Sequence, residues 1–282
     1  MKNKKYRTPF MLILAAAVHS FPVSAQSLES IKKQFPDQQA VLLSKTEHYT
    51  ISIQNGQPYV ESRDVQQIEY LTAQASAYLS RYSFYNSDFQ QVVAYEAYTQ
   101  TARDKKLKAN TFKTSSSSDD FVFYDDVKET TFDFPSVGEG AIGNLEVSRI
   151  NKDPHLLNPF YFASYVPVIN SELKISFPKD MVIRYRLIGN DTAKVELKIE
   201  KRRRENIYTF RFPNCPPQKR YADAPDPPWY ATHVIFYIDN YTDENGNRIS
   251  YLSNPDDLYR LNYSFIKTIN KELEPELKRI VD

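Results

Sequence analysis

The chain has 282 residues, with 36 Lys and Arg against 35 Asp and Glu, so it is close to neutral. This balance gives no indication of the broad basic surface with which proteins bind nucleic acid. Aromatic residues make up 14% of the chain and glycine occurs only six times, a composition that favours β-strands over disorder. The one cysteine, Cys215, cannot form an internal disulfide, so stability must come from the hydrophobic core.

The first 25 residues have the pattern of a secretory signal peptide. Four basic residues within positions 2–7 precede a short apolar run at 10–18, and small residues at 23–25 precede Gln26. The apolar run is about half the roughly 20 residues that a membrane-spanning helix needs. We therefore expect cleavage between Ala25 and Gln26, export to the periplasm or the medium, and no membrane span in the mature chain. Removal of four basic residues leaves the remainder with a net charge of −3.

Residues 26–34 are expected to form a leading segment of one or two helical turns, and the period then becomes mostly two. Two alternating runs, 41–53 and 59–65, flank Asn55-Gly56, a dipeptide that favours a two-residue hairpin turn. The pattern predicts a β-hairpin. The next segment, 66–83, fits either one face of a helix or a strand.

Further alternating runs predict adjacent strands at 89–99 and 105–112. The serine- and aspartate-rich stretch 115–120 is expected to be a solvated loop. A short strand at 121–124 and another at 130–134 should follow.

Residues 132–178 contain two β-type runs around an irregular loop with aromatic residues and proline, and three of the six glycines lie there. Short runs separated by turn signals continue beyond it, which is typical of an antiparallel sandwich. The expected strands are 172–177, 181–188, 193–199, 207–212 and a last one at 232–239, with a proline-rich crossing at 213–228.

The chain is expected to end in a helix. Asn254 is a suitable cap, Pro255 fits the first helical position, and leucine and isoleucine then recur at helical spacing, with a kink expected near Pro275. The predicted fold is therefore mainly β, an antiparallel β-sandwich over 35–253 with a long amphipathic C-terminal helix within 254–282. The apolar stripe of such a helix needs a surface to lie on, either the sandwich or another domain.

Cys215, His233 and Asp239 are the residue types of a thiol-based triad. A nucleophilic thiol needs a base within hydrogen-bond reach and a nearby cation or helix N-terminus. Prolines on both sides of the segment around Cys215 disfavour a helix there, so we expect no catalytic residues in this set.

Metal and cofactor sites are not expected. The oxygen-rich segment 239–247 does not follow the alternating ligand pattern of a calcium loop, and its Asn245-Gly246 favours a tight turn. Beyond His19 of the signal, the histidines are His48, His155 and His233, which lie in unrelated segments and form no zinc motif.

Three other groups have two interpretations each. The acidic residues Glu139 and Asp125-Asp126 could serve hydrolysis, but acidic pairs are common in a chain with 35 acids. The run Lys201-Arg-Arg-Arg204 is either a solvated strand end or a patch for an anionic ligand. Aromatic residues either fill the core or line a groove: Phe160, Tyr161, Phe162, Tyr165, Trp229 and Tyr230.

An ordered series of segments resembles a family of exported bacterial proteins that carry an N-terminal β-rich domain of unknown function upstream of a transglutaminase-like, papain-fold domain. The resemblance implies a catalytic core with Cys, His and Asp after the final helix, where this sequence stops, so no catalytic residue can be transferred. The segments that carry it are 35–37, 40–51, 132–135, 138–140, 157–162, 167–171, 175–178, 208–210 and 258–280.

We therefore expect an exported, non-catalytic β-domain that binds or positions a partner, either a transglutaminase-like protein or a cell-envelope protein or peptide. One alternative is a remnant or split half of a transglutaminase- or cysteine-protease-like enzyme whose catalytic domain lies elsewhere. Another is a hydrolase that uses surface carboxylates.

Overall fold

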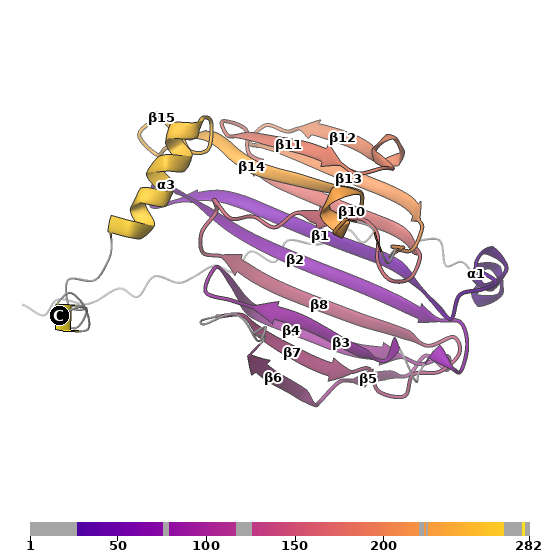
Figure 1. Ribbon diagram of the computed structural model, residues 1–282. Helices are drawn as coiled ribbons and strands as arrows, with labels where there is room; N and C mark the ends of the chain where they lie inside the picture. Colours follow the sequence, from indigo (N-terminus) through magenta and orange to yellow (C-terminus); the bar gives the residue numbers. More distant parts are fainter. Residues whose placement is uncertain are drawn as a thin grey trace, which may run out of the picture. The chain divides into compact units, whose positions relative to one another are not determined.

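A computed structural model describes residues 27–75, 79–116, 126–219, 223, 225–267 and 278–279 (Figure 1). The chain divides into two compact units, Met1–Pro36 and Asp37–Asp282. In the first unit, helix α1 (Leu28–Gln34) begins at Ser27, whose hydroxyl accepts a hydrogen bond from the Ser30 N–H at 3.3 Å. The expected short leading helix is thus present. Among the described residues, no helix combines the length and the apolar character needed to cross a bilayer.

The second unit is built on an eight-stranded sheet, which we call sheet A, in the order β12-β13-β10-β1-β2-β8-β4-β5. Its strands, in chain order, are β1 (Ala40–Gln54), β2 (Gln57–Tyr70), β4 (Gln90–Gln100), β5 (Lys106–Lys108), β8 (Ile142–Asn151), β10 (Val168–Pro178), β12 (Glu196–Lys201) and β13 (Glu205–Cys215).

The predicted β1–β2 hairpin is confirmed. Asn55 and Gly56 have φ of 51° and 73°, the two positive values that a type I′ turn requires. The strand β2 runs on to Tyr70, so the ambiguous segment 66–83 begins as a strand and not as a helix.

One ladder of sheet A is parallel. Strands β1 and β10 run in the same direction from Leu42↔Val168 to Thr50↔Ser176, whereas all other ladders between described strands are antiparallel. The predicted antiparallel sandwich therefore contains one parallel pair of strands, which the sequence analysis did not predict. Because neighbouring parallel strands need a long crossover, the intervening chain can build other strands before β10 returns beside β1.

Two smaller sheets complete the second layer. Sheet B has the order β3-β7-β6, with β3 (Arg81–Asn86), β6 (Phe112–Ser116) and β7 (Lys128–Asp133). Sheet C has the order β11-β14-β15, with β9 beside β14, and consists of β9 (Phe160–Tyr161), β11 (Val182–Ile188), β14 (His233–Thr242) and β15 (Arg248–Ser250).

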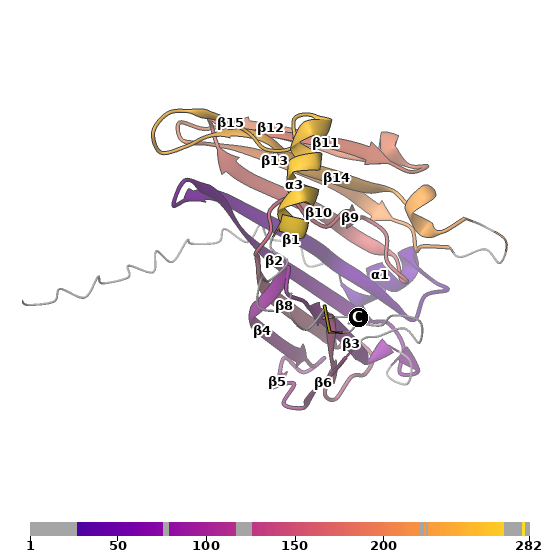
Figure 2. The same ribbon diagram turned by 60° about the vertical axis from the view of Figure 1, so that its left-hand side comes forward.

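Sheets B and C cover the same face of sheet A. Tyr49 of β1 packs edge-on against Phe236 of sheet C, with ring centroids 4.9 Å apart. Tyr95 of β4 packs against Phe84 of sheet B, also at 4.9 Å. Strand register places Tyr49 and Tyr95 on one face of sheet A, so the buried aromatic and aliphatic side chains form one core between the two layers. The strands of the three sheets are drawn in Figure 1 and Figure 2. The arrangement is the predicted sandwich.

Several predicted boundaries are corrected. Phe112 starts β6 of sheet B and does not extend β5, and Ser115 and Ser116 belong to that strand and not to a loop. The run 193–199 begins with a 3₁₀ turn, η1 (Thr192–Lys194), before β12. Strand β15 follows β14, so 232–239 is not the last strand. The predicted strand 121–124 lies outside the described residues.

The C-terminal helix α3 (Pro255–Lys267) begins at the predicted proline. The expected continuation through 268–277, including the kink at Pro275, also lies outside the described residues. A second 3₁₀ turn, η2 (Pro227–Trp229), lies in the proline-rich crossing.

Candidate functional site

The residues of the candidate triad occupy separate places. Cys215 ends β13 with 2% of its surface exposed, and burial raises the pKa of its thiol to about 12. His233 begins β14, with its Nδ1 2.8 Å from the carbonyl oxygen of Ala231. Asp239 lies six residues further along the same strand, about 20 Å away at a rise of about 3.3 Å per residue, and accepts a hydrogen bond from Arg184. The Cys215 thiol stays protonated at neutral pH, and Asp239 is too far to orient His233.

The oxygen-rich segment 239–247 forms the end of β14 and the turn into β15. The Asp243 carboxylate accepts hydrogen bonds from the N–H groups of Asn245 at 2.9 Å and Asn247 at 2.7 Å, so its oxygens close the turn. Of the pair Asn245-Gly246, only the glycine has a positive φ, at 84°. Within the described ranges, no group of three or more His, Cys, Asp or Glu side chains gathers as metal ligands would.

The remaining histidines are also apart. His48 lies on β1, with its Nε2 2.9 Å from the Ser176 hydroxyl, and burial lowers its pKa to about 4. The ring of His155, in the loop after β8, stacks on Tyr251 with centroids 3.8 Å apart. Both residues therefore have packing and hydrogen-bonding roles in separate parts of the unit.

The acidic and aromatic candidates do not meet either. Glu139 lies in the loop before β8, and Asp126 accepts a hydrogen bond from the Asp88 N–H, while Asp125 is outside the described residues. Phe160 and Phe162 are buried in the core, whereas the exposed fractions are 53% for Tyr165 and 77% for Trp229. Tyr230 is half-buried and donates a hydrogen bond to the carbonyl oxygen of Lys219.

Four charged side chains gather on the covered face of sheet A: Lys45, Glu47, Asp64 and Arg149, which we call the charged cluster. Glu47 of β1 lies directly opposite Asp64 of β2, and Arg149 Nη1 of β8 lies 3.9 Å from Asp64 Oδ2. Lys45 Nζ donates hydrogen bonds to the carbonyl oxygens of residues 161 and 163, at 2.5 and 3.1 Å. The cluster therefore ties β9 and the segment directly after it to sheet A.

Burial dominates the electrostatics of the charged cluster. It raises the pKa of Glu47 to about 7, with a further contribution from the charge of Asp64. It also raises the pKa of Asp64, against the opposing effect of Arg149, and it lowers the pKa of Lys45. A carboxyl group with a pKa of about 7, as on Glu47, can hold or release a proton near neutral pH. The sequence analysis did not single out these residues. Lys45 and Glu47 are two residues apart on β1, a spacing that places both side chains on the same face of the strand.

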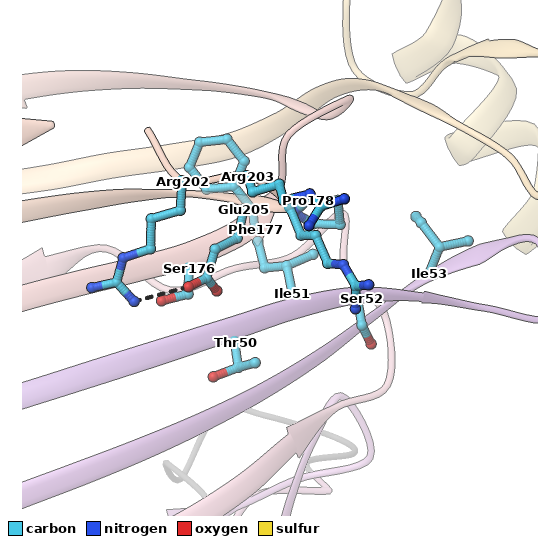
Figure 3. A pocket seen from close by; sticks show the side chains of 11 residues that line it. Thr50, Ile51, Ser52, Ile53, Ser176, Phe177, Pro178, Arg202, Arg203 and Glu205 are labelled. Carbon is cyan, nitrogen blue, oxygen red and sulfur yellow. Dashed lines mark hydrogen bonds and ion pairs between the residues drawn. The ribbon is translucent and has the colours of Figure 1, made fainter. Parts of the chain in front are cut away.

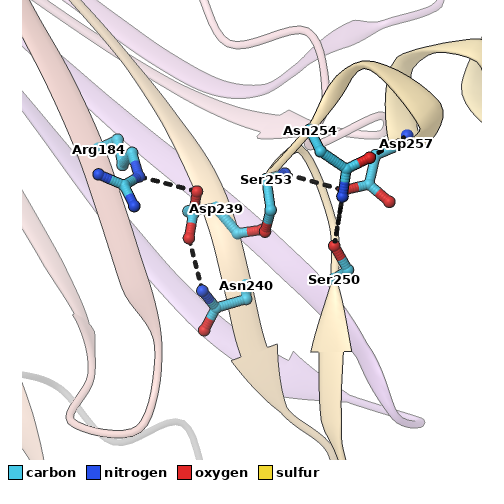
Figure 4. Close-up of polar contacts among 7 residues, drawn as sticks. All are labelled: Arg184, Asp239, Asn240, Ser250, Ser253, Asn254 and Asp257. Carbon is cyan, nitrogen blue, oxygen red and sulfur yellow. Dashed lines mark hydrogen bonds and ion pairs between the residues drawn. The ribbon is translucent and has the colours of Figure 1, made fainter.

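The base of α3 is fixed to the β14–β15 hairpin by a network of hydrogen bonds (Figure 4). The buried Asp257 carboxylate accepts from the Ser250 hydroxyl at 2.6 Å and from the Ser253 N–H at 2.9 Å. Asn254 caps the helix, accepting from the Asp257 N–H at 3.1 Å, as the sequence predicted. The Ser253 hydroxyl donates to the carbonyl oxygen of Asp239 at 2.7 Å. The orientation of the first turn of α3 is thus set by sheet C.

One side of α3 carries several exposed apolar side chains. The exposed fractions are 52% for Leu258, 73% for Tyr259, 63% for Tyr263 and 50% for Phe265. At about 100° per residue these four side chains lie on one side of the helix, with the exposed Asn262 among them, whereas Ser264 lies on the opposite side. In the part of the chain that the structure describes, no element buries this face. Exposed apolar side chains that gather on one side of an element are common at interaction sites.

Comparisons with known proteins address the fold. The chain resembles a crystal structure named "putative protease" from Parabacteroides distasonis, with a TM-score of 0.60 and 19% identity. The match covers 70% of this chain but only 40% of that one, and at this identity it shows the fold alone. An M1 zinc metallopeptidase from Deinococcus radiodurans matches with a TM-score of 0.35 and 11% identity over 71% of this chain and 43% of that one. None of the curated proteins matches.

The sequence itself matches a family. The profile described as "Domain of Unknown Function with solved-structure structure" covers residues 36–219, more than half of the chain and all the strands of sheet A. The resemblance to a β-rich domain of unknown function is therefore confirmed. This chain belongs to the DUF3857 family.

Proposed function

We propose that the protein is an exported, non-catalytic β-module that binds or positions a partner, with α3 as its docking helix. The observation that carries this proposal is that the base of α3 is held in place while its apolar side is exposed. Its base is held by Asp257, while Tyr259 and Tyr263 expose most of their surface. A helix with a fixed base loses little freedom when its face is covered, so it suits recognition of a partner.

The partner that we propose is a transglutaminase-like catalytic domain. Family membership supports this choice through the resemblance described above, and the longer "putative protease", of which this chain spans 40%, is consistent with it. If a separate reading frame directly downstream encodes such a domain, the two chains would be halves of one split enzyme that meet through α3.

Site-specific photo-crosslinking tests the docking helix. A photoreactive residue at Tyr263 of the full chain, in the cells that produce it, should form an adduct with a protein that contains a transglutaminase-like core. The same residue at Ser264, on the opposite side of α3, is the matched control and should give much less adduct. The proposal is wrong if Tyr263 gives no adduct, or one only with a second copy of this chain.

Export has its own test. The mature protein should be recovered from the periplasm or the medium with a mass that begins at Gln26. Ala25→Arg should block processing, because signal peptidases require a small residue at this position. Recovery of the unprocessed chain from the cytoplasm would contradict the proposed export.

A hydrolase is the second candidate, favoured by the facing carboxyl groups of Glu47 and Asp64. Purified protein should show no peptidase, amidase or glycosidase turnover if the module is non-catalytic. Turnover that Glu47→Gln abolishes and Cys215→Ala leaves intact would establish the hydrolase and refute the non-catalytic proposal.

A further inference from the structure

A pocket of about 580 Å³ lies where β1 and β10 separate (Figure 3). The parallel ladder ends at Thr50↔Ser176, but β1 continues to Gln54 and β10 to Pro178. Beyond Thr50, none of the described strands pairs with β1 on its β10 side. The volume lies within the roughly 300–1,000 Å³ typical of ligand pockets.

The walls of the pocket combine apolar surface with hydroxyl groups. The apolar part comes from Ile51 and Ile53 of β1 and from Phe177 and Pro178 of β10, and the hydroxyl groups come from Thr50, Ser52 and Ser176. In Figure 3, the β1 residues line one side and Phe177 and Pro178 the other. Such a lining suits a ligand with both apolar side chains and hydrogen-bonding groups.

The rim of the pocket is positively charged. It is formed by the β12–β13 turn, which contains the basic run found in the sequence. Arg202 is paired with Glu205 at 3.0 Å and with Glu200 at 3.3 Å. Arg203 and Arg204 are exposed and form no ion pair with any described residue. Three arginines and one glutamate give the lining a net charge of +2, which favours an anionic ligand.

We propose that this pocket binds the C-terminal end of an extended peptide. The backbone of β1 beyond Thr50 would pair with the peptide backbone, as in strand addition to an exposed edge. The last apolar side chains of the peptide would pack on Ile53 and Phe177. Its terminal carboxylate would accept charge-assisted hydrogen bonds from Arg203 and Arg204. This site is separate from α3 and does not rest on the docking role of that helix.

Fluorescence anisotropy with the full chain tests the proposal. The probe is a labelled hexapeptide that ends in Val-Ile with a free carboxylate, and the comparison is the same peptide as its C-terminal amide. The amide should bind at least about ten-fold more weakly, a difference of about 1.4 kcal/mol. Arg203→Gln combined with Arg204→Gln should weaken binding of the free acid to a similar degree and leave the amide unaffected. Binding of the acid should also fall as salt rises.

Lys201→Gln is the matched control, because Lys201 belongs to the same exposed basic run but does not line the pocket. It should leave the affinity within two-fold. Hydrogen exchange should show added protection of residues 51–54 when the free acid is bound. The assignment is overturned if acid and amide bind equally, if no peptide binds, or if octanoate binds through Arg203 and Arg204 while the peptide does not.

Discussion

Glu47 of β1 and Asp64 of β2 lie directly opposite one another on the covered face of sheet A, where both side chains are half-buried. Two carboxylates in cross-strand contact repel each other, and Lys45 and Arg149 flank them. The result is a carboxyl group on Glu47 with a pKa of about 7 inside the sandwich. This pair makes the stability of the domain depend on pH.

Glu47→Gln should stabilise the protein at alkaline pH. The folded pKa of about 7 exceeds the unfolded value of 4.5, so the folded state favours the protonated form. The contribution of Glu47 to the free energy of unfolding should therefore be greatest below pH 4.5, fall as the pH rises to 7 and then level off. The variant has no carboxyl group at this position and so avoids the loss. Between pH 4.5 and pH 8, its free energy of unfolding should rise by up to about 3 kcal/mol relative to that of the wild type. Urea unfolding of both proteins at pH 4.5 and at pH 8 checks this prediction. It is contradicted if the difference in free energy of unfolding between variant and wild type is the same at both pH values.

The Cys215 thiol should not react in the native protein. Burial raises its pKa to about 12, so almost no thiolate exists at pH 8. A thiol reagent such as DTNB should label the folded chain at least about 100-fold more slowly than the chain in urea. Rapid stoichiometric labelling of the native protein at pH 8 would show that the thiol is accessible and ionised.

Gly189→Ala should destabilise the protein strongly. Gly189 has a φ of 113°, and a Cβ atom there would lie 2.6 Å from the Ala231 carbonyl oxygen and the Thr232 Cα. Because both obstacles are backbone atoms, we expect a loss of about 3 kcal/mol or more. Gly246→Ala is the control, since Gly246 also has a positive φ, of 84°, but open space around it. Its cost should be about 1 kcal/mol. If thermal or urea unfolding shows similar losses of stability for Gly189→Ala and Gly246→Ala, the steric explanation is ruled out.

Asp257→Ala should loosen the base of α3. The substitution removes the acceptor for the Ser250 hydroxyl and the Ser253 N–H, and should cost about 1–2 kcal/mol. Hydrogen exchange of the α3 amides should accelerate. Asp256→Ala, at an exposed position one residue earlier, should change neither quantity appreciably. If both variants behave alike, the network does not hold the helix.

Local signals in the sequence predicted the elements that depend on a few neighbouring residues. Asn55-Gly56 predicted a hairpin because the two positive φ angles of its turn are easiest for these residue types. Asn254 and Pro255 predicted the start of α3, because capping involves only the first helical turn. By contrast, the alternation in 105–112 could not show that Lys106 and Phe112 belong to different sheets.

Contacts between distant segments were not predictable in this way. A period of two shows which side chains share a face of a strand, but not which strand lies alongside. The parallel pairing of β1 with β10 joins segments more than 100 residues apart, and the pocket lies where this ladder ends, at Thr50 and Ser176. The basic run was visible in the sequence, but only the turn between β12 and β13 places Arg203 and Arg204 beside Ile51 and Phe177.

The sequence by itself determined the family, the β character of the domain and the start of its final helix. It also led us to expect an export signal. Each of these depends on composition, on local backbone preference or on an ordered series of short segments. Tertiary structure alone decided that Glu47 faces Asp64, that Asp257 anchors α3, and that β1 and β10 separate around a pocket. These features depend on strand partners and register, for which the free energy comes from packing between segments far apart in the chain.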